Sequence, residues 1–351
     1  MIGASVLLKS GSSQFTISGT SSDLAGSTTS GNTNGTGAAA RFFSPTDMEF
    51  NPSGDLIICD TGNNLIRKLV VSTGVVTTVA GGAVAGASET NGNGTAASFI
   101  SPRGIAITPS GVMYIGDSGF CIIRRITGVN NTVSTFAGNS TNTGYLDGTG
   151  TTARFFNPEG ITLNSSNELF VCDRANHTIR KITTGATVSL FAGGGGSASS
   201  GSINGTGNAA RFNHVRSITI DGDGNFYVCD RSNYTIRKIT PAGVVTTLAG
   251  LANNTGSSDG IGSSARFSSP QGIKYNPKDN NLYVCDTSNH TIRKVTLDGI
   301  VTTIAGLANS SGDVNGVGSA IRLKTPTGIA INSLGHLYIA DTGNHKIKKI
   351  T

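Results

Sequence analysis

The feature that most constrains this chain is a segment that returns six times, at a spacing of 55–57 residues. Its fifth copy reads VCDTSNHTIRKVT and spans residues 284–296. Every copy has an aspartate that is followed seven positions later by a basic residue. The six pairs are Asp60 and Arg67, Asp117 and Arg124, Asp173 and Arg180, Asp230 and Arg237, Asp286 and Arg293, and Asp341 and Lys348. A repeat of this length indicates units that stack on one another, because each is too thin to bury its own faces.

Each copy contains four short runs that are rich in Val, Ile, Thr and Tyr. In the fifth copy these runs are residues 272–275, 282–286, 291–296 and 300–306, and Gly, Asn, Asp and Pro separate them. This composition favours β-strands joined by turns, and no stretch is typical of a long helix. Four short strands repeated at such a period predict a propeller blade. We therefore expect an all-β fold, a six-bladed β-propeller of four-stranded blades.

The two ends of the chain indicate how the ring closes. The sixth copy ends after its third strand, and SQFTISG at residues 13–19 is similar to VVTTLAG at 244–250. We expect residues 13–19 to supply the missing fourth strand of the last blade, with Phe15 and Ile17 in the core. Closure removes open sheet edges, which otherwise invite aggregation.

The predicted organisation is an N-terminal arm, residues 1–12, followed by one propeller domain, residues 13–351. We expect the arm to be available to contact a neighbouring subunit. No run approaches the ~20 apolar residues of a membrane helix. The N-terminus also lacks the basic region that is typical of a secretory signal. We expect no membrane insertion, and a protein that is cytoplasmic or assembled into a particle.

Three motifs connect the repeats to a known family. They are the P-x-G-I entry to the first strand of a blade, the LYV-x-D strand, and the D-x-x-N-H-x-I-R-K hairpin. The first occurs at residues 102–105, 158–161, 270–273 and 326–329. With these motifs the chain resembles the NHL-repeat six-bladed propellers over about residues 13–351. The resemblance implies the fold and leaves the activity open, since one fold hosts many functions.

Chemically reactive residue types recur around the ring instead of converging once. The six Asp–basic pairs therefore predict bracing, across a hairpin or between blades, and not catalysis. Four cysteines share one strand position, which places them beyond the ~7 Å limit for a disulfide, so we expect small buried hydrophobic residues. Histidines 177, 290 and 345 share a position that other blades fill with Asn, Cys or Tyr, which indicates surface or inter-blade packing. We expect no metal and no cofactor.

Positions that differ between blades are where function is expected. The residue after the entering proline varies, and so does the first residue of the hairpin turn. We predict that these positions place a mixed polar set at one mouth of the central channel; its members are Arg103, Glu159, Arg216, Gln271, Arg174 and Arg231. A solvated rim without a ligand is the alternative. Connecting loops of roughly twenty residues, rich in Ser, Asn, Thr and Gly, should surround the same face.

The favoured function is a non-enzymatic scaffold that presents this loop-rich face to a protein or glycan partner, as in a virion or at a cell surface. Two alternatives stay open. The NHL resemblance implies a channel-centred metal-dependent lyase or lactonase, or an RNA-binding propeller. For the lyase or lactonase, this sequence has no clear set of metal-binding residues that would face the channel. The second is disfavoured because 17 of the 26 basic residues, 12 in the repeated hairpins and five in the A-R-F loops, occupy repeated positions.

Overall fold

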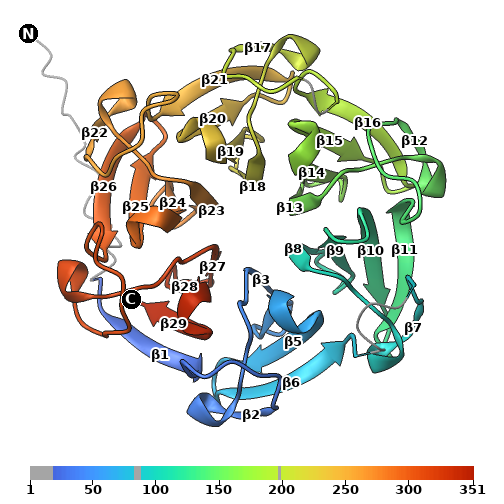
Figure 1. Ribbon diagram of the computed structural model, residues 1–351, viewed down its shortest axis with the longest axis horizontal. Coiled ribbons are helices and arrows are strands. Elements are labelled where there is room, and N and C mark those ends of the chain that lie inside the picture. Colours follow the sequence, from blue (N-terminus) through green and yellow to red (C-terminus); the bar gives the residue numbers. More distant parts are fainter. Residues whose placement is uncertain (1–18, 83–87, 197–198) are drawn as a thin grey trace, which may run out of the picture.

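Six antiparallel sheets surround a central channel as the blades of a propeller (Figure 1). The computed structural model describes residues 19–82, 88–196 and 199–351. Within these ranges the chain forms strands and short 3-10 turns and has no α-helix. Accordingly, no helix of this part is long and apolar enough to cross a membrane. The predicted six-bladed all-β propeller is confirmed.

Blade 5 illustrates the plan that the repeat encodes. Its strands run outward from the channel in chain order, as β23 (Pro270–Asn276), β24 (Asn281–Asp286), β25 (Thr291–Thr296) and β26 (Ile300–Ala305). The Val, Ile and Tyr side chains of these strands alternate between the two faces of the sheet, and the neighbouring blades cover both faces.

The other blades repeat this plan. Blade 1 has β3 (Asp47–Phe50), β4 (Leu56–Asp60), β5 (Leu65–Val70) and β6 (Val75–Ala80). Blade 2 has β8 (Pro102–Ile107), β9 (Met113–Asp117), β10 (Ile122–Thr127) and β11 (Thr132–Gly138). Blade 3 has β13 (Pro158–Leu163), β14 (Leu169–Asp173), β15 (Thr178–Ile182) and β16 (Thr187–Ala192). Blade 4 has β18 (Val215–Ile220), β19 (Phe226–Asp230), β20 (Thr235–Ile239) and β21 (Val244–Ala249).

The ring closes through an N-terminal strand, as predicted, but the position of that strand is corrected. Blade 6 consists of β27 (Gly328–Ile331), β28 (Leu337–Asp341), β29 (Lys346–Ile350) and β1 (Ser21–Gly26). Strand β1 pairs with β29, from Ser21 opposite Ile350 to Gly26 opposite Lys346. The closing strand is therefore not residues 13–19. Gly19 precedes β1, whereas residues 13–18, with Phe15 and Ile17, and the arm of residues 1–12 lie outside the described residues.

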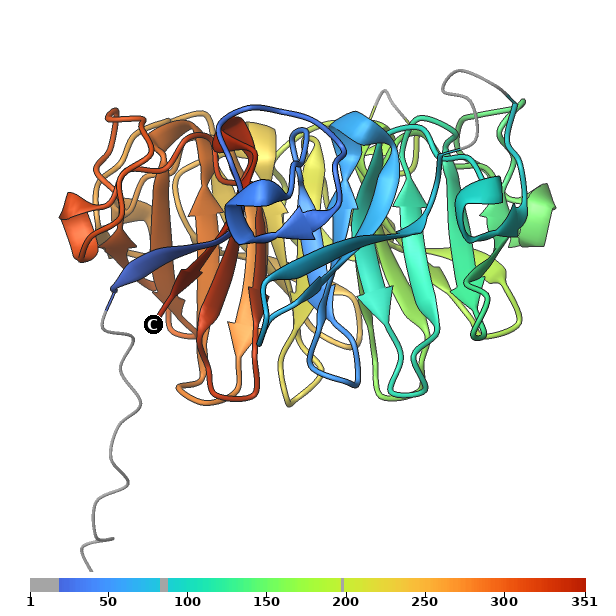
Figure 2. The same ribbon diagram turned by 90° about the horizontal axis from the view of Figure 1, so that it is seen from below.

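The connecting loops add a feature that the four-strand prediction did not include. A two-residue strand in the loop pairs with the outermost strand of five blades; these strands are β2 (Gly35–Thr36), β7 (Gly92–Asn93), β12 (Gly148–Thr149), β17 (Gly205–Thr206) and β22 (Gly260–Ile261). The loops run along the outer edge and over one face of the ring (Figure 2). They protect edges that would otherwise offer unpaired backbone groups.

A short turn joins the second and third strands of each blade. Five of these turns are 3-10 helices, namely η2 (Thr61–Asn63), η5 (Arg174–Asn176), η7 (Arg231–Asn233), η9 (Thr287–Asn289) and η11 (Thr342–Asn344). In blade 2 residues 118–120 form the equivalent turn. We call the side of the ring that carries these six turns the hairpin face.

Steric crowding explains why the P-x-G-I motif contains a glycine. The innermost strands of adjacent blades approach so closely that a Cβ atom on Gly104 would lie 1.9 Å from the Glu159 carbonyl oxygen. A Cβ atom on Gly272 would lie 2.3 Å from the carbonyl oxygen of Thr327 in the next blade. Only glycine permits this approach without moving the backbone.

The core lies between neighbouring blades. In one such cluster, Phe267 and Ile273 of blade 5 pack against Tyr227 and Cys229 of blade 4. The four equivalent cysteines, Cys59, Cys172, Cys229 and Cys285, are free and buried, as the sequence predicted. They act as small apolar residues in this core.

Candidate functional site

The repeated Asp–basic pairs brace single hairpins. In blade 4, Asp230 Oδ2 accepts hydrogen bonds from Arg237 Nη1 (2.8 Å) and Asn233 Nδ2 (2.7 Å), and its Oδ1 accepts one from the Asn213 amide (2.7 Å). Arg237 also donates to the carbonyl of Ile203, in the preceding loop (3.1 Å). The pair therefore fixes both the turn and the loop that leads into the blade. The equivalent Arg–Asp distances are 2.9 Å in blade 1, 3.1 Å in blade 3 and 2.8 Å in blade 5.

Blades 2 and 6 depart from this arrangement. In blade 6, Lys348 contacts Asp23 (2.5 Å) and Asp313 (2.9 Å) instead of forming an ion pair with Asp341. In blade 2, Arg124 lies 3.6 Å from Asp117, whose Oδ2 is buried and has no hydrogen-bond partner in the part of the chain that the structure describes. Phe120 there occupies the position of the asparagine that donates to the aspartate in the other five blades. Burial raises the pKa of Asp117 to about 8, compared with about 6 for Asp173 of blade 3.

Substituting Phe120→Asn should reduce the loss of stability between about pH 5 and pH 8. The folded-state pKa of Asp117 lies above its unfolded value of ~3.9, so the stability that this group contributes is complete below about pH 4 and is lost as the pH rises to about 8. A new amide donor should lower that pKa. The free energy of unfolding, measured by denaturant titration between about pH 5 and pH 8, should then fall less steeply than in the wild type. Phe120→Ala removes the same ring without adding a donor, and a reduced slope in that control would contradict this account.

The shared histidine position joins adjacent blades. Its backbone is left-handed in every blade, for example at His345 (φ 57°) and Asn64 (φ 58°). His345 Nδ1 accepts a hydrogen bond from the amide of Ser44 (3.1 Å), and Asn64 Oδ1 accepts one from Ser101 (2.8 Å). His177 and His290 accept from the next blade in the same way. The sequence indicated surface or inter-blade packing, and these contacts are inter-blade hydrogen bonds.

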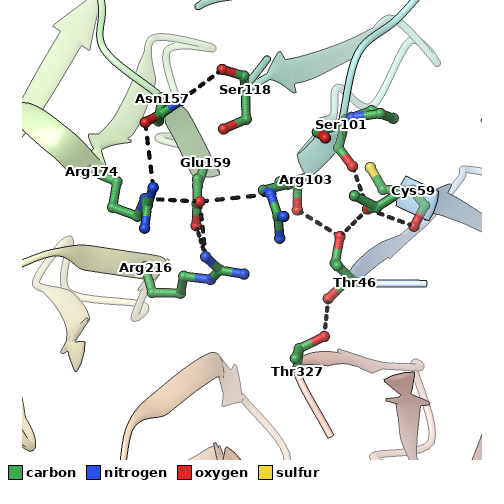
Figure 3. Close-up of polar contacts among 12 residues, drawn as sticks. Thr46, Cys59, Ser101, Arg103, Ser118, Asn157, Glu159, Arg174, Arg216 and Thr327 are labelled. Atoms are coloured by element: carbon green, nitrogen blue, oxygen red, sulfur yellow. Dashed lines mark hydrogen bonds and ion pairs between the residues drawn. The ribbon is translucent and has the colours of Figure 1, made fainter. Parts of the chain in front are cut away.

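The variable polar residues meet around one buried carboxylate at the mouth of the channel (Figure 3). Glu159 is 2% exposed. Its carboxylate lies 2.7 Å from Arg216 Nη1, 3.1 Å from Arg174 Nε and 3.8 Å from Arg103 Nε. Burial lowers the pKa of Arg216 to about 10, and the nearby charge of Glu159 opposes this effect. The charges of Arg103, Arg174 and Arg231 add to the lowering. Arg216 remains a cation at neutral pH.

The arginines of the mouth all lie on one side of it. Blades 2, 3 and 4 contribute the arginines and Glu159, whereas blades 5, 6 and 1 place Gln271, Thr327 and Thr46 around the same opening. The structure thus brings Arg103, Glu159, Arg216 and Gln271 to one mouth, where Glu159 contacts three arginines, Arg174 among them. Arg231 begins the turn η7 on the same face. That buried ion cluster was not predicted, since sequence offsets within a blade do not fix distances between blades.

The channel below the mouth is narrow. The cavity between Thr46, Glu159, Arg216 and Gln271 has a volume of about 20 Å³, enough for a single water. Asp47 of β3 also lines it, where four other blades have glycine, and burial raises the pKa of Asp47 to about 7. Farther along these strands, Lys274 of blade 5 forms an ion pair with Glu49 of blade 1. Among the described residues, no three or more His, Cys, Asp or Glu side chains lie together in a way that could hold a metal.

A larger groove leads away from the mouth across the hairpin face. It has a volume of about 480 Å³ and lies over blades 6, 1 and 2. Hydroxyl-bearing residues, among them Ser44, Ser101 and Thr342, make up much of its wall, together with Ile100. Arg103 and Arg216 belong to both the groove and the mouth. The sequence reasoning missed this groove, because its wall combines residues from both ends of the chain.

The blade plan, the bracing hairpins and the closing strand together define an NHL-repeat six-bladed propeller. The chain belongs to the family described as Teneurin NHL domain, whose family model matches residues 73–351. NHL repeat-containing protein 2 from Bos taurus is 29% identical over 333 residues, which cover 84% of this chain and 44% of that protein. The chain thus spans less than half the length of this relative.

Solved structures share the fold at low sequence identity. An auxiliary nutrient binding protein from Bacteroides ovatus ATCC 8483 superposes with a TM-score of 0.71 at 18% identity, covering 95% of this chain and 76% of that chain. A virginiamycin B lyase from Staphylococcus aureus superposes with a TM-score of 0.55 at 16% identity, covering 88% and 94%. Both binding proteins and enzymes therefore use this architecture, and the likeness extends to the fold alone.

Proposed function

We propose that this propeller is a non-enzymatic binding module, and that its hairpin face contacts a glycan or protein partner through the groove beside the channel mouth. The observation that carries this proposal is that the groove adjoins the variable polar residues of the mouth, through Arg103 and Arg216, and is also large enough for a ligand. Its volume of about 480 Å³ falls within the ~300–1,000 Å³ of typical ligand sites, whereas the channel cavity of about 20 Å³ does not. The low charge and the polar loops of the sequence favour a more specific version of this proposal, in which the protein is a component of a virion or of a cell surface.

The enzyme alternative receives less support from the site. Asp47 has the raised pKa that a general acid or base can have, but it lies in a cavity too small for a substrate. The histidines of the hairpin turns accept inter-blade hydrogen bonds through Nδ1, which leaves them in structural roles. Stoichiometric metal in protein purified without a chelator, together with turnover of a lactone or a streptogramin, would overturn the proposal.

Filling the groove should weaken partner binding. Ile100 lines the groove at a repeat position that other blades fill with Phe, Asn, Ser or Lys, so Ile100→Trp should fold normally while blocking the groove. Phe156→Trp changes the equivalent position of blade 3 and serves as the control. Ligands selected by the wild type from a glycan array and a peptide-display library should bind Ile100→Trp at least about tenfold more weakly and bind the control unchanged. The proposed site would be contradicted if the selected ligands bound Ile100→Trp as tightly as the wild type, or if the wild type selected no ligand from either source.

A further inference from the structure

We propose that the arginine-rich side of the channel mouth binds the carboxylate of an acidic saccharide that lies in the adjoining groove. This inference rests on the proposed function and names the chemistry of its ligand. Its support comes from the charge at the mouth, from two departures from the repeat, and from the lining of the groove.

The mouth has more positive charge than its own carboxylates neutralise. Arg103, Arg174 and Arg216 lie around the carboxylate of Glu159, and the charge of Arg231 also acts on Arg216. Asp47 lines the same cavity, and with a pKa of about 7 it adds only a partial negative charge at neutral pH. Burial and the charges of Arg174 and Arg231 lower the pKa of the neighbouring His214, as expected where cations accumulate. The side chain of Arg216 is only 14% exposed, so water solvates it poorly. An anionic ligand group would balance this excess of charge.

Two of these arginines occupy a repeat position at which other blades have a threonine that forms an inter-blade hydrogen bond. The residue after the repeated aspartate is a threonine in blades 1, 5 and 6. Its hydroxyl donates to a proline carbonyl of the next blade, at 2.5 Å from Thr61, 2.7 Å from Thr287 and 2.7 Å from Thr342. Blades 3 and 4 have Arg174 and Arg231 at this position. Both blades thus lack an inter-blade hydrogen bond that the repeat offers, and both gain a cation at the mouth.

The arginines retain donors for a ligand. Arg231 Nε is buried without a hydrogen-bond partner among the described residues. Arg174 Nε lies 3.1 Å from a Glu159 oxygen in an ion pair, and Arg174 Nη2 donates to Asn157 Oδ1 (3.3 Å). A guanidinium presents five N–H donors in a planar fork that matches a carboxylate. Glu159 itself demonstrates that a carboxylate fits between these side chains.

The groove favours a saccharide over a peptide as the bearer of that carboxylate. Its wall consists largely of hydroxyl, amide and backbone groups, with Ile100 as its aliphatic member and no aromatic anchor among its lining residues. Peptides commonly bind by adding a strand to a sheet edge or by inserting apolar anchors. The two-residue strands cover the outer edges of five blades, which leaves little room for strand addition. The volume of the groove suits a short oligosaccharide.

The test uses the full chain and three carboxylated probes, namely trigalacturonate, sialyllactose and a hyaluronan tetrasaccharide, each compared with its methyl ester. Calorimetry should detect binding of at least one acid, weaker binding of its ester, and affinity that falls with added salt. The double variant R174T/R231T restores the repeat residue and should remain folded, because Arg216 and Arg103 still pair with Glu159. It should nevertheless bind that acid at least about tenfold more weakly, since charge-assisted hydrogen bonds are lost. Lys278→Thr, which removes an exposed charge in a loop of blade 5, is the matched control and should bind normally.

A second variant tests the same site by a gain of affinity. Glu159→Gln removes the competing carboxylate and should tighten binding of the same acid. Failure of all three acids to bind, equal binding of the esters, or unchanged affinity in R174T/R231T would overturn the inference, as would selection of acidic peptides alone. A ligand that is sensitive to Ile100→Trp but not to R174T/R231T would overturn this inference and leave the proposed function standing.

Discussion

A chain that begins at residue 27 should unfold at a much lower denaturant concentration than a chain that begins at residue 19. The two differ by strand β1, which pairs with β29 and buries Ala25 against the last blade. Removing β1 also removes Asp23, which contacts the fully buried Lys348. The lost ladder hydrogen bonds contribute ~1 kcal/mol each, and Lys348 keeps Asp313 as its remaining acidic partner. We expect a total destabilisation of about 3–5 kcal/mol, measured by denaturant titration with circular dichroism.

The shorter chain should also associate. Without β1, strand β29 presents an open edge of backbone donors and acceptors, which is a template for pairing with another chain. Light scattering should therefore detect aggregates of the chain that begins at residue 27 and none of the chain that begins at residue 19. Equal unfolding midpoints and equal scattering would contradict closure of the ring by β1.

The fold could be predicted because its blade sequence is repeated six times. The strand that closes the ring occurs only once, so no second copy shows which residues form it. The similarity of residues 13–19 to another outermost strand rested on local apolar pattern. The better guide is the Ala-Gly pair that ends all six outermost strands, which aligns Ala25 and Gly26 with Ala80 and Gly81. The glycine is required there by a left-handed backbone, with φ of 94° at Gly26 and 92° at Gly81. A conformational requirement of this kind is a more reliable alignment marker than hydrophobicity.

The site was predictable to the extent that the ring is symmetric. Because equivalent residues of every blade lie at equivalent heights, variation at one repeat position placed Arg103 and Glu159 at the same mouth. Contacts across the ring follow no sequence offset, so the ion pair of Lys274 with Glu49 could not be foreseen. The hydrogen-bonding role of the histidine position was also hidden, since Asn, Cys and His accept a hydrogen bond there with different atoms.

Removing the charge of a bracing aspartate should have very different effects in blades 4 and 2. Asp230 accepts three hydrogen bonds through its two oxygens, one of them from the fully buried Arg237. Asparagine offers a single acceptor oxygen, so in Asp230→Asn the new amide group must face a donor, and Arg237 loses its counter-charge. We expect a loss of about 3–5 kcal/mol in the free energy of unfolding at neutral pH.

Asp117→Asn is the matched substitution, and it should cost less than about 1 kcal/mol. Asp117 Oδ1 accepts one hydrogen bond from the Ile100 amide (2.9 Å), which an asparagine oxygen can also accept. Its Oδ2 has no hydrogen-bond partner among the described residues, and with a pKa near 8 the carboxyl group is largely protonated at neutral pH. Arg124 is held instead by the carbonyls of Ser98 and Thr90. Equal losses in the two variants would mean that blade 2 is braced like the others, so the contrast tests whether Phe120 has changed the charge state of its aspartate.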